Sequence, residues 1–188
     1  MIYLSKVNLL RSYARIVSLV ISSQVYEECT RQLWSEDARK IRSLVQEKII
    51  TLCQVPEVNQ LALPHLGAGE KSTIELYYLL KADSVIIDDR KGIRMCKKLR
   101  IPFLCAILVP GMLQQSHMLS GPDETDQFIE KICQIGRYGE WIIQYARENK
   151  PPKPDKLVEK GTHTCLQETD QEIDNEMASV DHTDFSSD

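Results

Sequence analysis

The 188-residue sequence lacks any apolar run long enough to cross a membrane. Its longest apolar stretches, at 16–21 and 101–110, are far shorter than the roughly 20 residues that a membrane-spanning helix needs. Lys6, Asn8 and Arg11 interrupt the apolar residues near the start, so a signal-peptide pattern is missing too. Together with the 27% of charged residues, these absences argue against a membrane or fibrous protein, and we expect a cytoplasmic one.

Cysteine and histidine patterns that carry chemistry are also missing. The six cysteines are scattered without a Cys-x-x-Cys pair, which indicates neither a zinc site nor a disulfide framework. Most of them lie in apolar stretches, where we expect small core residues. The four histidines are isolated, so no Ser/His/Asp or Cys/His constellation stands out. A P-loop is absent from GAGEKS at 67–72, because Glu70 separates the glycine from the lysine.

The composition of the chain changes after Lys150. Three prolines in the next four residues stiffen the backbone, and the residues that follow are polar and acidic. Residues 151–188 hold 3 lysines and 10 acidic residues, a charge of −7, so the overall −4 leaves residues 1–150 at +3. We expect a folded domain at 1–150 and a disordered acidic tail at 151–188. The tail either keeps the protein soluble or competes with a polyanionic ligand for a basic face.

Apolar patterns within residues 1–150 predict helices that alternate with strands. The predicted helices lie at 4–13, 35–48, 70–81 and 90–99, with a further one capped by Ser22 or Ser23. The predicted strands lie at 16–21, 49–55, 84–88 and 103–108. Because parallel strands need crossover connections, this order predicts a three-layer α/β/α fold with a mostly parallel central sheet. Ligands of such sheets bind beyond the carboxyl ends of the strands.

Several acidic residues stand where such a site would form. Asp88 and Asp89 follow a predicted buried strand, and Glu70 lies in the first turn of a predicted helix. Glu28 marks a third acidic position. Close carboxylates repel each other, and hard cations such as Mg²⁺ or Mn²⁺ offset that repulsion. The alternative interpretation is structural: Asp89 caps the next helix, Asp88 faces solvent, and both glutamates lie on ordinary helix surfaces.

A basic cluster directly follows the acidic pair. Its members are Arg90, Lys91, Arg94, Lys97, Lys98 and Arg100, several of them at helical spacing. We expect the cluster to bring a phosphate to the acidic site, with Arg90, Lys91, Arg94 and Lys97 as the contacts. A solvated helix face is the alternative interpretation.

Three blocks of the sequence resemble, in order and spacing, the DUF3368 branch of the PIN-domain nuclease family. They are VYEE at 25–28, LGAGE at 66–70 and ADSVIIDDRKG at 82–92. The resemblance spans roughly residues 2–145 and includes LSKVNLL at 4–10. It implies that acidic residues from separate elements bind Mg²⁺ or Mn²⁺, which activates water for attack on an RNA phosphodiester. The matching positions are Glu28, Glu70, Asp88 and Asp89.

The resemblance also implies partners. Many similar proteins are toxin ribonucleases, which implies an RNA substrate, an antitoxin protein and a homodimer. The family's first strand and its aspartate, expected before Ile2, have no counterpart. Two interpretations follow. Either the sequence begins at an internal methionine of a metal-dependent endoribonuclease, or the protein is a noncatalytic PIN-like module that binds nucleic acid or protein.

Overall fold

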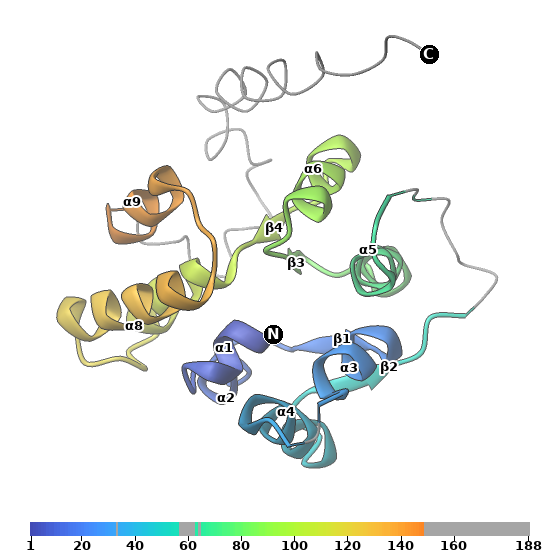
Figure 1. The fold of residues 1–188 in the computed structure, drawn as a ribbon, viewed down its shortest axis with the longest axis horizontal. Coiled ribbons are helices and arrows are strands. Elements are labelled where there is room, and N and C mark those ends of the chain that lie inside the picture. Colours follow the sequence, from blue (N-terminus) through green and yellow to red (C-terminus); the bar gives the residue numbers. More distant parts are fainter. Residues whose placement is uncertain (33, 57–62, 64, 149–188) are drawn as a thin grey trace, which may run out of the picture.

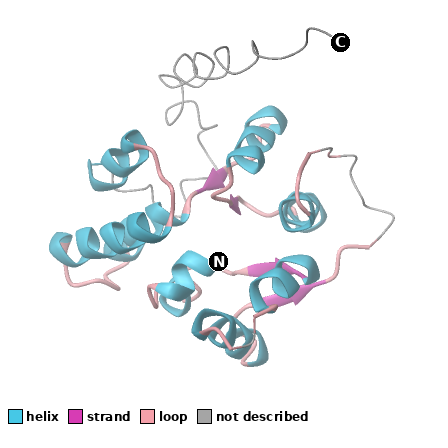
Figure 2. Cartoon of the chain, viewed as in Figure 1, coloured by secondary structure: helices cyan, strands magenta, loops and turns pink. Residues whose placement is uncertain are grey.

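The computed structural model describes residues 1–32, 34–56, 63 and 65–148. Helices predominate and the strands are short (Figure 2). None of the helices in this part of the chain is long and apolar enough to span a bilayer. The boundary expected at residue 150 and the acidic tail at 151–188 lie outside the described residues.

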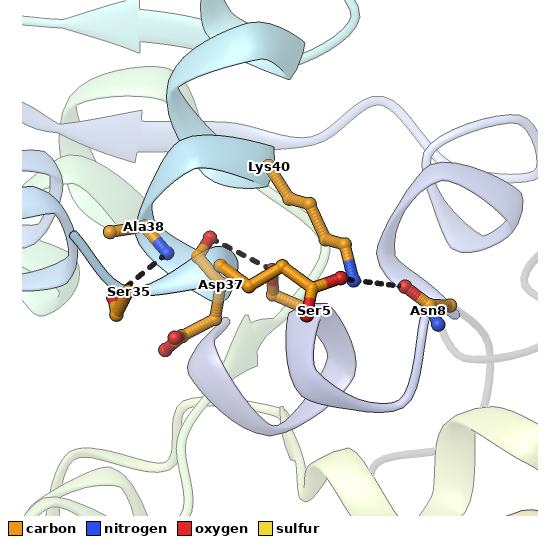
Figure 3. Close-up of polar contacts among 7 residues, drawn as sticks. Ser5, Asn8, Ser35, Asp37, Ala38 and Lys40 are labelled. Atoms are coloured by element: carbon orange, nitrogen blue, oxygen red, sulfur yellow. Dashed lines mark hydrogen bonds and ion pairs between the residues drawn. The ribbon is translucent and has the colours of Figure 1, made fainter. Parts of the chain in front are cut away.

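The chain begins with two short helices, α1 (Ile2–Lys6) and α2 (Leu10–Tyr13). The single helix predicted over 4–13 is therefore wrong, because Asn8 turns the chain with a left-handed φ of 62°. Asparagine adopts this conformation more readily than most residues. α1 packs against the start of α4 (Glu36–Gln46), where the hydroxyl of Ser5 donates to the carbonyl oxygen of Asp37 (Figure 3).

The four strands form two parallel pairs. β1 (Val20–Ser22) pairs with β2 (Thr51–Cys53), and β3 (Val85–Ile86) pairs with β4 (Phe103–Leu104). Helices cross over within each pair, so the predicted α/β class with parallel strands is confirmed. Among the described residues the two pairs remain separate sheets, and the beginning of the chain lies between them (Figure 1).

The second pair ends earlier than the sequence predicts. The strand expected over 103–108 stops at Leu104, and the chain continues as the 3-10 helix η2 (Ala106–Leu108) and then α7 (Val109–Gln115). The reason is a tertiary contact, because the backbone N–H of Ala106 donates to the side chain of Asp88 at 2.8 Å instead of extending the ladder. An apolar run of this length fits a strand or a buried helix equally well.

The connecting helices begin where polar caps predict. Ser22 caps α3 (Ser23–Thr30), because its Oγ accepts a 3.1 Å hydrogen bond from the backbone N–H of Val25. Ser35 caps α4 in the same way. α5 (Ala68–Leu80) and α6 (Arg90–Leu99) follow, and the bounds of α6 match those predicted.

Two apolar cores hold these elements together. The larger core includes Leu4, Ile41 and Leu113, together with Ile129 of α8 (Pro122–Ile135) and Ile142 of α9 (Glu140–Glu148).

The smaller core joins α5, β3 and α6. It is formed by Ile74, Val85, Ile87, Cys96 and Ile101. Glu70 lies in the first turn of α5, whereas Asp88 and Asp89 lie between β3 and α6. This core therefore determines how these acidic residues lie relative to one another.

Candidate functional site

Two buried serines connect the end of β1 to the first turn of α5 through a hydrogen bond. The hydroxyl oxygens of Ser22 and Ser72 lie 2.7 Å apart, and Ser72 also donates to the carbonyl oxygen of Gly69. Because the proton of Ser72 is used in that bond, Ser22 is the donor between the two hydroxyls. The first turns of α3 and α5 are therefore held together.

Glu28 of α3 reaches the start of α5. Its Oε1 accepts a 3.0 Å hydrogen bond from the backbone N–H of Gly69, although the residue as a whole is exposed. A Cβ at position 69 would overlap this carboxylate, so the close approach requires glycine. The N-terminal end of a helix carries partial positive charge, which favours a carboxylate there.

Glu70 lies between the starts of two helices. It is half-buried in the first turn of α5, and its carboxylate turns back over Gly67. Its Cγ lies 3.4 Å from the place that a Cβ on Gly92 of α6 would occupy. The structure thus brings Glu28 and Glu70 to the same helix start and places Glu70 against α6.

Asp89 is the N-cap of α6. Its Oδ2 accepts hydrogen bonds from the backbone N–H of Lys91 at 2.7 Å and of Gly92 at 3.2 Å. The capping interpretation that the sequence left open is therefore correct for this residue. Its predicted role as a metal ligand remains a prediction.

Asp88 points to the other side of the link between β3 and α6. It is half-buried, and its Oδ1 accepts from the backbone N–H of Ala106 at 2.8 Å and from the hydroxyl of Tyr138 at 2.6 Å. The alternative in which Asp88 simply faces solvent is therefore wrong. Within the described residues, both bonds fall on Oδ1, which leaves Oδ2 as the oxygen for a ligand.

Sequence reasoning missed Tyr138, which lies in the loop between α8 and α9. Burial first, and then the charge of Asp88 and the hydrogen bond to it, raise the pKa of Tyr138 far above its usual range. The phenol therefore stays protonated and remains a donor to Asp88. Its ring meets that of Tyr3 edge-on, with centroids 6.2 Å apart. No signal in the sequence connects Tyr138 with an aspartate 50 residues earlier.

A further polar atom near Glu28 has no partner. The Oε1 of Gln24 is buried and accepts no hydrogen bond from the part of the chain that the structure describes. Gln24 precedes Glu28 by four residues on α3, so both side chains lie on one face of the helix.

The four carboxylates offer the right chemistry for a hard cation but no closed cage. Oxygen ligands suit Mg²⁺ and Mn²⁺. Across the described ranges, no three side chains of His, Cys, Asp or Glu converge to hold a metal ion. Backbone amides already bind the carboxylates of Glu28 and Asp89. Mg²⁺ commonly uses only one or two carboxylates together with waters and substrate phosphates, so a closed cage is not required for binding.

The basic cluster divides between two faces of α6. Lys91, Arg94 and Lys98 line a groove of about 380 Å³, which Met95 and the preceding residues His65 and Leu66 complete. Arg90 and Lys97 are not among the lining residues. Only two of the four predicted phosphate contacts, Lys91 and Arg94, therefore share one concave surface.

Comparison with known proteins agrees with this geometry. The family model described as "DUF3368: PIN domain" matches residues 1–140, a span that contains the four carboxylates and Tyr138. No curated protein and no solved structure matches the chain. The chain belongs to the DUF3368 family of PIN domains and has the nuclease-type fold of that family.

Proposed function

We propose that this PIN domain is a metal-dependent endoribonuclease that hydrolyses RNA phosphodiester bonds with Mg²⁺ or Mn²⁺. The observation that carries the proposal is the environment of Asp88. Two donors orient one carboxylate oxygen and leave the other for a ligand, directly beside a helix that concentrates positive charge. A half-buried, oriented carboxylate next to a cationic surface is typical of a site that binds a phosphate through a cation.

The residues have distinct proposed roles. Asp88 and Glu70 hold the metal ion. Glu28 of α3 adds negative charge, because its carboxylate lies at the start of α5. Asp89 holds the first turn of α6 and thereby sets the direction in which Lys91 points. When bound, the metal ion would polarise the phosphate and generate a hydroxide nucleophile near neutral pH. The cations of α6 attract the polyanionic substrate.

The test is cleavage of a mixed-sequence single-stranded RNA by the full 188-residue chain. We expect cleavage with Mn²⁺ or Mg²⁺, none with EDTA, and a loss of at least about a hundredfold in Glu70→Gln and Asp88→Asn. The amide oxygen that Asp88→Asn introduces still accepts both hydrogen bonds, so the fold is retained. Glu27→Gln, an exposed neighbour on α3, is the matched control. Cleavage that survives EDTA, or that Asp88→Asn leaves unchanged, would contradict the proposal.

A noncatalytic RNA-binding role is the second candidate. The binding of Glu28 and Asp89 to backbone amides favours it, because in that state neither carboxylate has all its oxygens free for a metal. This role predicts RNA binding by the folded chain without cleavage under any metal condition. It also predicts that Glu70→Gln and Asp88→Asn leave RNA affinity unchanged.

The toxin role, the antitoxin and the homodimer are proposals that rest on family analogy. A toxin ribonuclease predicts that expression of the chain arrests growth, and that Asp88→Asn relieves the arrest. A homodimer predicts a mass near twice 21.6 kDa in light scattering. Growth unaffected by an active enzyme would exclude the toxin role.

A further inference from the structure

The groove beside α6 combines cationic and apolar walls. Lys91, Arg94 and Lys98 stand three and four residues apart, so they form one row on the helix. The row is about 10 Å long at the rise of 1.5 Å per residue. Leu66 and Met95 are half-buried and give the groove an apolar wall. Lys91 lines the groove and its backbone N–H binds Asp89, so the groove begins close to Asp89.

The three cations of this row have no carboxylate partner among the described residues. A second groove, of about 310 Å³, offers a comparison. This second groove contains two cations, and each has a carboxylate partner: Lys40 pairs with Glu36, and Arg11 pairs with Glu47. Among the described residues, the positive charge of the second groove is therefore neutralised by carboxylates, whereas that of the groove beside α6 is not.

The sequence of α6 is hard to explain by solubility alone. Residues 90–100 contain six cations and no acidic residue. Arg94 stands four residues from both Arg90 and Lys98, and like charges at this spacing destabilise a helix. Solvated helices usually alternate the sign of their charges. An anionic ligand would offset the repulsion.

We infer that the groove binds one nucleotide of the RNA, with its phosphate on Arg94 and its base against Leu66 and Met95. The planar guanidinium of arginine matches a phosphate with two parallel hydrogen bonds. Lys91 and Lys98 flank it and contact the same phosphate or its neighbours. A base offers a flat face to the apolar wall, and the thioether of Met95 contacts aromatic rings favourably. An acidic peptide offers the charge without that face.

The inference rests on the proposed RNA substrate and names the place of the nucleotide that adjoins the acidic site. Lys91 connects the two, because its side chain lines the groove while its backbone N–H binds Asp89. The groove thereby provides a binding subsite that holds the strand while the acidic residues act on the adjacent phosphodiester.

The experiment is calorimetric titration of the full chain, in EDTA, with 5′-AMP, adenosine, inorganic phosphate and a hexaglutamate peptide. We expect 5′-AMP to bind at least about tenfold more tightly than each of the other three. Arg94→Gln should weaken 5′-AMP binding by about tenfold, as for the loss of a hydrogen bond to a charged group. Arg42→Gln, the same change at an exposed arginine of α4 that does not line the groove, should have no effect.

The controls separate this inference from the proposed function. Equal binding of phosphate and 5′-AMP, tighter binding of the peptide, or an equal effect of Arg42→Gln would overturn the nucleotide assignment. Because the titrations contain no metal ion, they do not depend on cleavage. Loss of 5′-AMP binding in Arg94→Gln without any RNA cleavage would uphold the groove and refute the nuclease. RNA cleavage by the chain, together with unchanged 5′-AMP binding in Arg94→Gln, would uphold the nuclease and refute the groove.

Discussion

The hydroxyl of Tyr138 donates a 2.6 Å hydrogen bond to Oδ1 of Asp88. This bond ties the loop before α9 to the end of β3. It also acts together with the backbone N–H of Ala106 to set the direction of Oδ2. Tyr138 is thus a positioning residue for the proposed metal ligand and touches no substrate itself.

Replacing Tyr138 with phenylalanine should lower both stability and Mn²⁺ affinity. The charge-assisted bond is lost while the ring contact with Tyr3 is kept. Because Asp88 is only half-buried, we expect the free energy of unfolding to fall by about 1–2 kcal/mol. Urea denaturation measures this, and Mn²⁺ titration measures the affinity. Tyr78→Phe, at a tyrosine that is 47% exposed, is the control. An unchanged Mn²⁺ affinity would make the role of Tyr138 purely structural.

Gly69→Ala should separate stability from activity. The new Cβ would overlap the exposed, flexible carboxylate of Glu28, which can swing away. The lost hydrogen bond and the better helix propensity of alanine then nearly cancel, and unfolding free energy changes by less than about 1 kcal/mol. If Glu28 contributes to the site, RNA cleavage falls as much as in Glu28→Gln. A large loss of stability in thermal unfolding would show that Glu28 cannot move.

Gly92→Ala should be far more destabilising. Here the Cβ would meet the buried side chain of Ile87, which the smaller core holds in place. Overpacking of this kind costs about 1–3 kcal/mol. Urea denaturation should show this loss, and Gly92→Ala combined with Ile87→Val should recover part of it. If the single variant is as stable as the wild type, α6 does not pack on β3 as closely as described.

Substitutions of Asp89 distinguish a cap from a metal ligand. Asparagine caps helices about as well as aspartate, whereas alanine costs about 0.5–2 kcal/mol. A purely structural Asp89 predicts that Asp89→Asn retains stability and Mn²⁺ affinity, while Asp89→Ala loses stability through its bonds to α6. Thermal unfolding and Mn²⁺ titration measure the two effects. A drop in Mn²⁺ affinity in Asp89→Asn would restore the ligand role.

Alkaline pH should destabilise the protein through Tyr13. Burial raises the pKa of this phenol from 10.0 to about 12, so the folded state prefers it protonated. The stabilisation is complete below about pH 10 and is lost as the pH rises towards 12, by roughly 2–3 kcal/mol in total. Urea denaturation between about pH 8 and pH 12 should show a flatter decline in Tyr13→Phe than in the wild type. Identical pH profiles would contradict the prediction.

Local patterns predicted a good part of this structure. Ser22 caps the helix that it was expected to cap, and the bounds of α6 were correct. These features depend on neighbours within four residues, so short segments specify them. The order of the four acidic residues was also visible, and the family match covers all of them.

The sequence by itself determined the α/β class, the family and which acidic and basic residues we propose as ligands of a cation or a phosphate. Only the tertiary structure decided where each of these residues lies and which groups it contacts. It ended the strand at Leu104, because Asp88 takes the N–H of Ala106, and it brought Tyr138 to the same oxygen. It also brought Leu66 to the groove that Arg94 lines. Such contacts join residues far apart in the chain, and their geometry depends on how the two cores pack.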